Sequence, residues 1–114
     1  MRPDDAVRIR HMIEAAEIAQ TLVAERRRAD LEADRTLQLA LARAIEIVGE
    51  AASRVSPELR ATLPSIPWRS LVSTRNRLIH AYFDIDLDFL WATAREEIPP
   101  LLSILRSIPS QHGP

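Results

Sequence analysis

The stretch Asp34–Val55, DRTLQLALARAIEIVGEAASRV, decides the fold of this chain. Its apolar residues return every three or four positions, and this spacing predicts a long α-helix with one continuous apolar face. The residues of that face are Leu37, Leu41, Ala44, Ile45, Val48, Ala51 and Ala52, and we expect Leu39, Ala40 and Ile47 to widen it. A helix that is apolar around so much of its circumference should lie at the centre of the fold, with neighbours on more than one side.

Another helix is expected before this segment, over about residues 4–28. Pro3 suits its first turn, and the run Arg26–Arg28 suits a C-terminal end, because basic side chains there interact favourably with the helix dipole. Its apolar stripe consists of Ile9, Met12, Ile13, Ala16, Ala19, Leu22 and Val23. A polar break over 29–34 should separate the two helices.

Three more helices are expected after the central one. Ser56–Glu58 combines a capping hydroxyl, a first-turn proline and an acidic residue, which indicates a short helix that the next two prolines close. The last helix is expected over 87–107, and Pro99–Pro100 must kink or split it because each proline removes an amide donor. Between them a helix is expected over 67–81, with the apolar residues Trp68, Leu71, Val72, Leu78 and Ile79.

Together these elements predict an all-α fold, a compact bundle of four to five helices. At 114 residues the chain fits one domain, which we expect to span 1–108 and to be followed by a disordered tail at 109–114. The most apolar stretch, Leu37–Val48, contains two charged residues and is too short to span a bilayer. The N-terminus is charged and unlike a signal peptide, so we expect a cytoplasmic protein without membrane contact.

Composition excludes several kinds of chemistry. The chain contains no cysteine, which rules out disulfides, thiolate nucleophiles and cysteine-ligated zinc. All 15 basic residues are arginine, and the net charge is −1. A net charge so close to zero gives no global attraction to a polyanion, so any nucleic-acid site must be a local basic patch.

The segment Arg75–Tyr82, RNRLIHAY, concentrates cations, an amide, a histidine and a phenol within eight residues. On a helix Asn76 and His80 lie one turn apart on the same face, whereas Arg75 and His80 are about 140° apart. Two copies of this helix facing each other across a two-fold axis would bring Arg75 of one copy near His80 of the other. We therefore expect a homodimer formed through these helices.

Such a site is suited to cleavage of RNA. Arginine stabilises charge that develops on a phosphate, and histidine transfers protons near neutral pH. If the 2′-hydroxyl is the nucleophile, neither a metal nor a cofactor is required, and the products are a 2′,3′-cyclic phosphate and a 5′-hydroxyl. The structural alternative is a helix end where cations suit the dipole and Arg77 pairs with an aspartate.

Other polar residues have structural interpretations. Glu46 and Glu50, one turn apart on the central helix, are more often structural carboxylates than catalytic ones. Asp84, Asp86 and Asp88 are better explained as turn and cap residues than as a metal site. His11 and His112 lack neighbours at metal-ligand spacing and are expected at the surface.

The segment RNRLIHAY resembles the Arg-x4-His-x-Tyr motif of HepT-type toxins in the HEPN superfamily. The resemblance extends to Ala44–Ala51, to Ile66–Arg69 and to Trp91 with Ile98–Leu101, and so covers nearly the whole chain. It implies a HEPN-like helical fold, a homodimer and metal-independent ribonuclease activity.

The resemblance also implies roles for single residues. Arg75 and His80 would be the catalytic pair, and Asn76 and Arg77 would support the site or contact RNA. Tyr82 would be the residue to which an antitoxin, a nucleotidyltransferase of the MntA type, transfers AMP, blocking the site with a bulky anion. The alternatives are a non-catalytic HEPN module that binds a nucleotidyltransferase or a nucleotide, and a purely structural helical dimer.

Overall fold

The computed structural model describes residues 1–81 and 83–109, and all regular secondary structure in this part of the chain is helical. The longer helices are α1 (Pro3–Val23), α3 (Arg35–Ser53), α5 (Trp68–Ile79) and α7 (Ile98–Arg106). The shorter elements are α2 (Arg28–Ala33), α4 (Pro57–Thr62), α6 (Leu87–Ala92) and the π-helical turn η1 (Thr93–Glu97). The predicted all-α bundle is confirmed.

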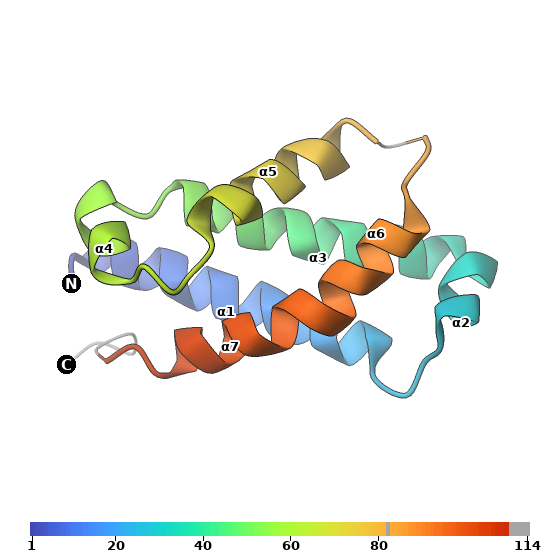
Figure 1. The fold of residues 1–114 in the computed structure, drawn as a ribbon, viewed down its shortest axis with the longest axis horizontal. Helices are drawn as coiled ribbons and strands as arrows, with labels where there is room; N and C mark the ends of the chain where they lie inside the picture. Colours follow the sequence, from blue (N-terminus) through green and yellow to red (C-terminus); the bar gives the residue numbers. More distant parts are fainter. Residues whose placement is uncertain (82, 110–114) are drawn as a thin grey trace.

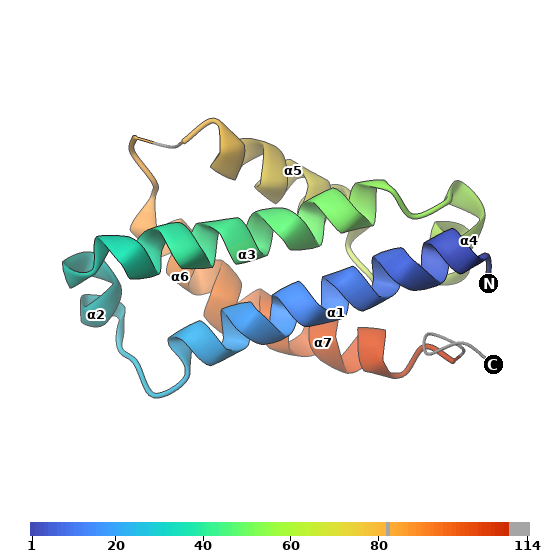
Figure 2. The ribbon, with the colours of Figure 1, turned by 180° about the vertical axis from the view of Figure 1, so that it is seen from behind.

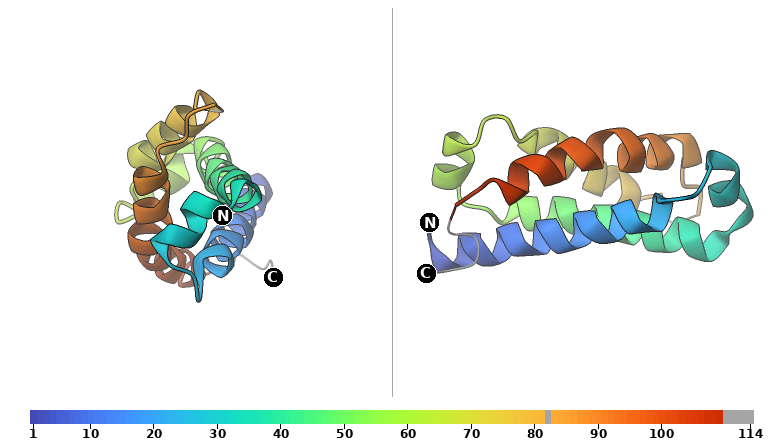
Figure 3. Two further views of the ribbon diagram at one scale, coloured as in Figure 1. Left: turned by 90° about the vertical axis from the view of Figure 1, so that its right-hand side faces the viewer. Right: turned by 90° about the horizontal axis from the view of Figure 1, so that it is seen from below.

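Helices α1 and α3 run antiparallel and form the centre of the bundle (Figure 1). Helix α7 packs along α1, and α5 packs along the other side of α3 (Figures 1 and 2). Viewed along the bundle, α5 occupies an outer position above α3 (Figure 3). As predicted, α3 is contacted on more than one side, because it also touches α2 and α6.

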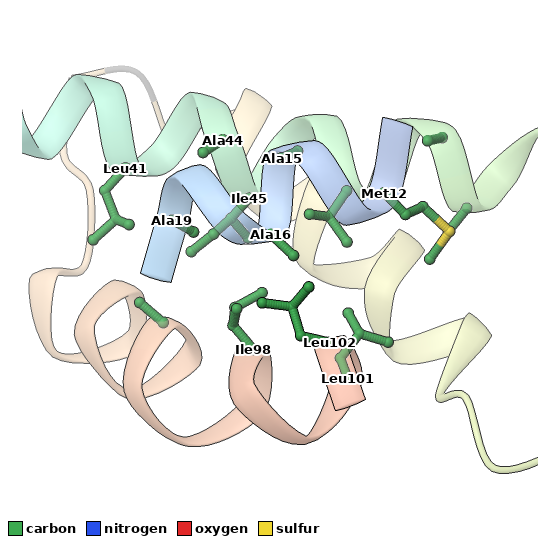
Figure 4. Packing of buried hydrophobic residues seen from close by; sticks show 14 of the residues in the cluster. Met12, Ala15, Ala16, Ala19, Leu41, Ala44, Ile45, Ile98, Leu101 and Leu102 are labelled. Carbon is green, nitrogen blue, oxygen red and sulfur yellow. The ribbon is translucent and has the colours of Figure 1, made fainter. Parts of the chain in front are cut away.

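The core forms where α1, α3 and α7 meet. Alanines at the contact, among them Ala15, Ala16 and Ala44, let α1 and α3 approach closely, and Ile45 and Leu102 fill the space beneath them (Figure 4). Each fully buried leucine or isoleucine contributes about 1.5–3 kcal/mol through the hydrophobic effect. The core therefore holds these three helices together and leaves α5 at the periphery.

The predicted apolar face of α3 is buried along its whole length, from Leu37 to Ala52. The prediction that Leu39 and Ala40 widen this face is wrong, because both are exposed to solvent. Ile47 is half-buried and packs against the core from one side. The buried surface of α3 is set by the directions from which α1 and α5 approach, and Leu39 and Ala40 face away from both.

Helix α1 ends at Val23, five residues earlier than predicted from the sequence. The chain then turns, with Glu25 at a φ of 63°, and the expected polar break contains α2 instead. This turn brings Leu31 into the core, where its carbonyl accepts a hydrogen bond of 2.9 Å from the buried Gln38 side chain. The arginine run therefore does not end a helix, and Arg28 begins α2 and pairs with Asp88 at 2.8 Å.

The last helix is interrupted, as Pro99 and Pro100 predict, but the interruption lies about one turn before these prolines. Residues 93–97 form the π-helical turn, in which the amide of Ile98 donates to the carbonyl of Thr93. The rings of Pro99 and Pro100 crowd the preceding turn and lack amide donors, so a wider turn accommodates them. No helix among residues 1–81 and 83–109 is long and apolar enough to cross a membrane.

A buried carboxylate joins the start of α1 to the start of α4. Asp5 is 4% exposed and accepts hydrogen bonds from the Ser56 amide at 2.8 Å and the Ser56 hydroxyl at 2.6 Å. Burial, the largest single influence, raises the pKa of Asp5, but both bonds from Ser56 and the charge of Arg2 outweigh it, so the pKa is lowered overall. Ser56 also caps α4 by accepting from the Leu59 amide, as predicted.

We expect Asp5→Ala to lower the free energy of unfolding at neutral pH by about 1–3 kcal/mol, because it leaves the Ser56 amide without its acceptor. Denaturant titration measures this loss, and Asp4→Ala, at an exposed neighbouring carboxylate, is the control. The pKa of Asp5 is lower in the folded protein than in the unfolded chain. Its contribution to the free energy of unfolding is therefore present above the pKa of the unfolded chain and is lost as the pH falls through the pKa of the folded protein. A difference between parent and variant that persists undiminished at about pH 2 would contradict this assignment.

Candidate active site

Helix α5, which contains most of the predicted motif, lies on the outside of the bundle. It packs mainly against α3, and Leu78 is its one buried residue. The other apolar residues predicted for this helix are half-buried: Trp68, Leu71, Val72 and Ile79. Most of the surface of α5 therefore remains accessible to a substrate or to a second protein.

Gly49 allows α5 to approach α3 closely. A Cβ atom at this position would lie 2.5 Å from the carbonyl oxygen of Leu71 and would also clash with the Cβ of Arg75. The stem of Arg75 therefore packs directly against the backbone of α3. This close approach places the start of the motif beside Glu50, the next residue of α3.

Arg75 is held by two partners. Its guanidinium forms an ion pair of 2.9 Å with Glu50 and donates a hydrogen bond of 2.9 Å to the side-chain oxygen of Asn76. Glu50 also accepts from Arg54, at 3.0 and 3.1 Å. The hydrogen bond from Arg54, more than the charge of Arg75, lowers the pKa of Glu50, so the carboxylate that holds Arg75 is ionised at neutral pH.

His80 is the C-cap residue of α5 and is exposed. It follows Asn76 by one turn, so both lie on the same side of the helix. Within the described chain the partners of Arg75 are Glu50 and Asn76, and neither is His80. The structure thus brings Arg75 and Asn76 together and leaves His80 on the solvent side, in accord with the angle of about 140° expected between Arg75 and His80.

Arg77 fastens the end of α5 to α6. Its guanidinium pairs with Asp86 at 3.0 Å and lies 3.8 Å from the centre of the Phe89 ring. Asp86 also caps α6 by accepting from the Phe89 amide. This is the structural alternative for Arg77 that the sequence left open, and it matches the interpretation of Asp86 as a cap residue.

Tyr82, the predicted modification site, lies outside the described residues, as do residues 110–114 of the predicted tail. Among residues 1–81 and 83–109, no group of three or more histidine, aspartate or glutamate side chains is arranged to hold a metal ion. Asp88, in the first turn of α6, pairs with Arg28.

Sequence reasoning missed two residues that shape this site. A glycine within so apolar a helix indicates the close approach of another backbone, so Gly49 is the signal that could have found this contact. The sequence favours a structural role for Glu50, but its pairing with Arg75 spans 25 positions of the chain and has no local signature. Only the packing of α5 on α3 brings the two side chains together.

Comparison with known proteins identifies relatives over most of the chain. A family model described as "Ribonuclease HepT-like" matches residues 12–108. A protein of Thermococcus cleftensis named "Probable ribonuclease HepT" is 40% identical over 88 residues, which cover 77% of this chain and 80% of that protein.

More distant relatives are also named as RNases. One from Methanocaldococcus jannaschii is 38% identical over 60% of this chain and 62% of its own length. Another, from Caldanaerobacter subterraneus, is 34% identical over 69% of this chain and 70% of its own length. No solved structure matches the chain.

The close approach at Gly49 leads to a prediction about stability. In an isolated helix, Gly→Ala stabilises by about 1 kcal/mol. Here we expect Gly49→Ala to destabilise the protein by about 1–3 kcal/mol, because the added methyl group forces α3 and α5 apart. Thermal and denaturant unfolding show whether the substitution raises or lowers the free energy of unfolding.

Thr36→Ala is the matched control, since Thr36 is exposed on the same helix and should tolerate alanine without loss. If Gly49→Ala were as stable as the parent protein, the close packing of α5 on α3 would be wrong.

Proposed function

Because this chain belongs to the HepT-like family of ribonucleases, we propose that it is a metal-independent endoribonuclease whose catalytic residues are Arg75 and His80. The observation that supports this most directly is the arrangement on α5. Arg75 is oriented by Glu50 and Asn76 at the surface, and His80 is exposed one turn beyond Asn76. A cation and a proton carrier are what in-line cleavage of RNA requires.

In the proposed reaction the 2′-oxygen of a ribose attacks the adjacent phosphorus and loses its proton to a base. The bond from phosphorus to the 5′-oxygen breaks, and the leaving oxygen takes a proton. His80 transfers one or both of these protons, and Arg75 donates hydrogen bonds to the phosphate oxygens as their negative charge increases. The products are a 2′,3′-cyclic phosphate and a 5′-hydroxyl.

We propose that the complete site forms between two copies of the chain. Arg75 faces α3 within its own protomer, whereas His80 faces solvent. A two-fold axis beside α5 would place His80 of one protomer near Arg75 of the other, and part of the accessible surface of α5 would form the interface. Asn76, which contacts Arg75, would then orient both the arginine and the substrate.

We further propose that the protein is the toxin of a toxin–antitoxin pair. A nucleotidyltransferase antitoxin of the MntA type would transfer AMP to Tyr82, two residues after His80. The attached nucleotide would fill the cleft and repel the RNA backbone through its phosphate charge. The alternative is a non-catalytic module that binds a nucleotidyltransferase or a nucleotide; a site that retains both Arg75 and His80 favours catalysis.

The ribonuclease proposal predicts cleavage in the presence of EDTA. Purified protein incubated with RNA should produce fragments with 2′,3′-cyclic phosphate ends, and His80→Ala and Arg75→Gln should each slow cleavage by about 100-fold or more. His11→Ala, at an exposed histidine of α1, and Arg106→Gln, at an arginine that pairs with Glu17, are the matched controls and should cut like the parent. RNA left intact by the parent, or cut equally by the Arg75 and His80 variants, would refute the proposal.

The proposed neutralisation predicts a change of mass. After co-expression with an MntA-type nucleotidyltransferase, the chain should gain one or more AMP units, and the modified protein should no longer cut RNA. Tyr82→Phe keeps the ring, lacks the phenolic oxygen and should gain no mass. Modification of Tyr82→Phe to the same extent as the parent would exclude Tyr82 as the target.

A further inference from the structure

An open groove of about 750 Å³ lies between α4 and the first part of α5. Its polar lining consists of Arg60, Arg69, Ser73 and Asn76, and its apolar lining includes Trp68 and Val72. None of the described side chains that line it is acidic. The groove is therefore a local basic patch on a chain whose net charge is −1.

The two arginines of the groove differ from those of the motif. Arg75 and Arg77 are engaged by Glu50 and Asp86. In the described part of the chain, neither Arg60 nor Arg69 takes part in an ion pair with an acidic residue. Their charges are thus available to an anion that enters the groove.

Arg60 also contains an unsatisfied donor. Its Nε atom is buried and has no hydrogen-bond partner among the described residues. A buried N–H without an acceptor is unfavourable, and a guanidinium pairs well with two oxygens of a phosphate. Because Nε itself is buried, an oxyanion in the groove would be held by the rest of the Arg60 guanidinium, which lines the groove.

The groove is continuous with the candidate active site. Arg69, Ser73, Asn76 and His80 are spaced by four, three and four residues, so they form one stripe along α5, about 16 Å long. Asn76 lines the groove and also contacts Arg75. A linear substrate whose reacting bond lies at His80 could therefore extend along this stripe into the groove.

From these observations we propose that the α4–α5 groove binds the sugar–phosphate backbone of single-stranded RNA next to the cleaved bond. Arg60 and Arg69 contact the phosphates, and the apolar lining accommodates riboses or unstacked bases, as in other single-strand binding surfaces. The assignment of RNA as the ligand rests on the proposed ribonuclease function. The presence of the groove, its positive charge and its continuity with His80 are independent of that function.

The test measures binding, so that it does not depend on cleavage. A labelled single-stranded RNA oligonucleotide is titrated with the full-length His80→Ala protein, which should leave the RNA intact. In this background we expect Arg60→Gln and Arg69→Gln each to weaken binding about fivefold. The double variant should reduce the slope of log affinity against log salt concentration by about 1.4, which is 0.7 for each lost phosphate contact.

A second substitution guards against misfolding of the Arg60 variant. Ser73 is exposed on α5, so Ser73→Glu should fold normally while placing a negative charge in the groove. It should weaken RNA binding, whereas Ser103→Glu, at an exposed serine of α7, and Arg106→Gln should not. Circular dichroism verifies that each variant is folded.

Two results would overturn the inference. The first is that Arg60→Gln, Arg69→Gln and Ser73→Glu all bind RNA as tightly as the His80→Ala protein. The same conclusion would hold if these substitutions weakened binding of another protein but left the affinity for RNA unchanged. The second is competition by free AMP at the same concentration of phosphate as the oligonucleotide, which would indicate a mononucleotide site. Either result is separate from the cleavage assay, so failure of the groove and failure of the ribonuclease proposal are distinguishable.

Discussion

The close packing of α5 against α3 at Gly49 is the contact on which the candidate site depends. Because residue 49 has no side chain, the stem of Arg75 can lie against the backbone of α3. The next residue, Glu50, then reaches the guanidinium of Arg75. Helix α5 buries only Leu78 fully, and Trp68 and Leu71 pack against the core as partly buried residues. One small residue on the central helix thus permits both the close approach of the outer helix and the orientation of its first motif residue.

The charges along α5 are divided between structural and accessible roles. Arg75 and Arg77 are held by Glu50 and Asp86, which anchor the helix at its middle and at its C-terminal end. His80 and Asn76 face solvent, and this side of the helix continues into the groove that contains Arg69. A chain with almost no net charge can therefore present a positive surface to a polyanion, because its acidic residues neutralise some arginines and leave others unpaired.

The elements that the sequence predicts well are those whose signals are local. The apolar face of α3, the capping of α4 by Ser56 and the motif helix depend on spacing within one element, and each was confirmed. The errors arose where distant parts of the chain decide the outcome. Helix α1 ends early because Leu31 must return to the core. Leu39 is exposed because the bundle approaches α3 from other sides.

By itself the sequence determined the helical class, the central helix and the segment in which chemistry is concentrated, since periodicity, caps and a short motif are properties of neighbouring residues. It also determined that Arg75 and His80 point in different directions, since helix geometry places them about 140° apart. Only the tertiary structure decided which partner each charge has. The pairing of Arg75 with Glu50 and the engagement of Arg77 by Asp86 each join residues on different elements, and the groove that contains Arg60 lies between α4 and α5. Side-chain pairs of this kind depend on how helices pack, and packing is a property of the folded chain as a whole.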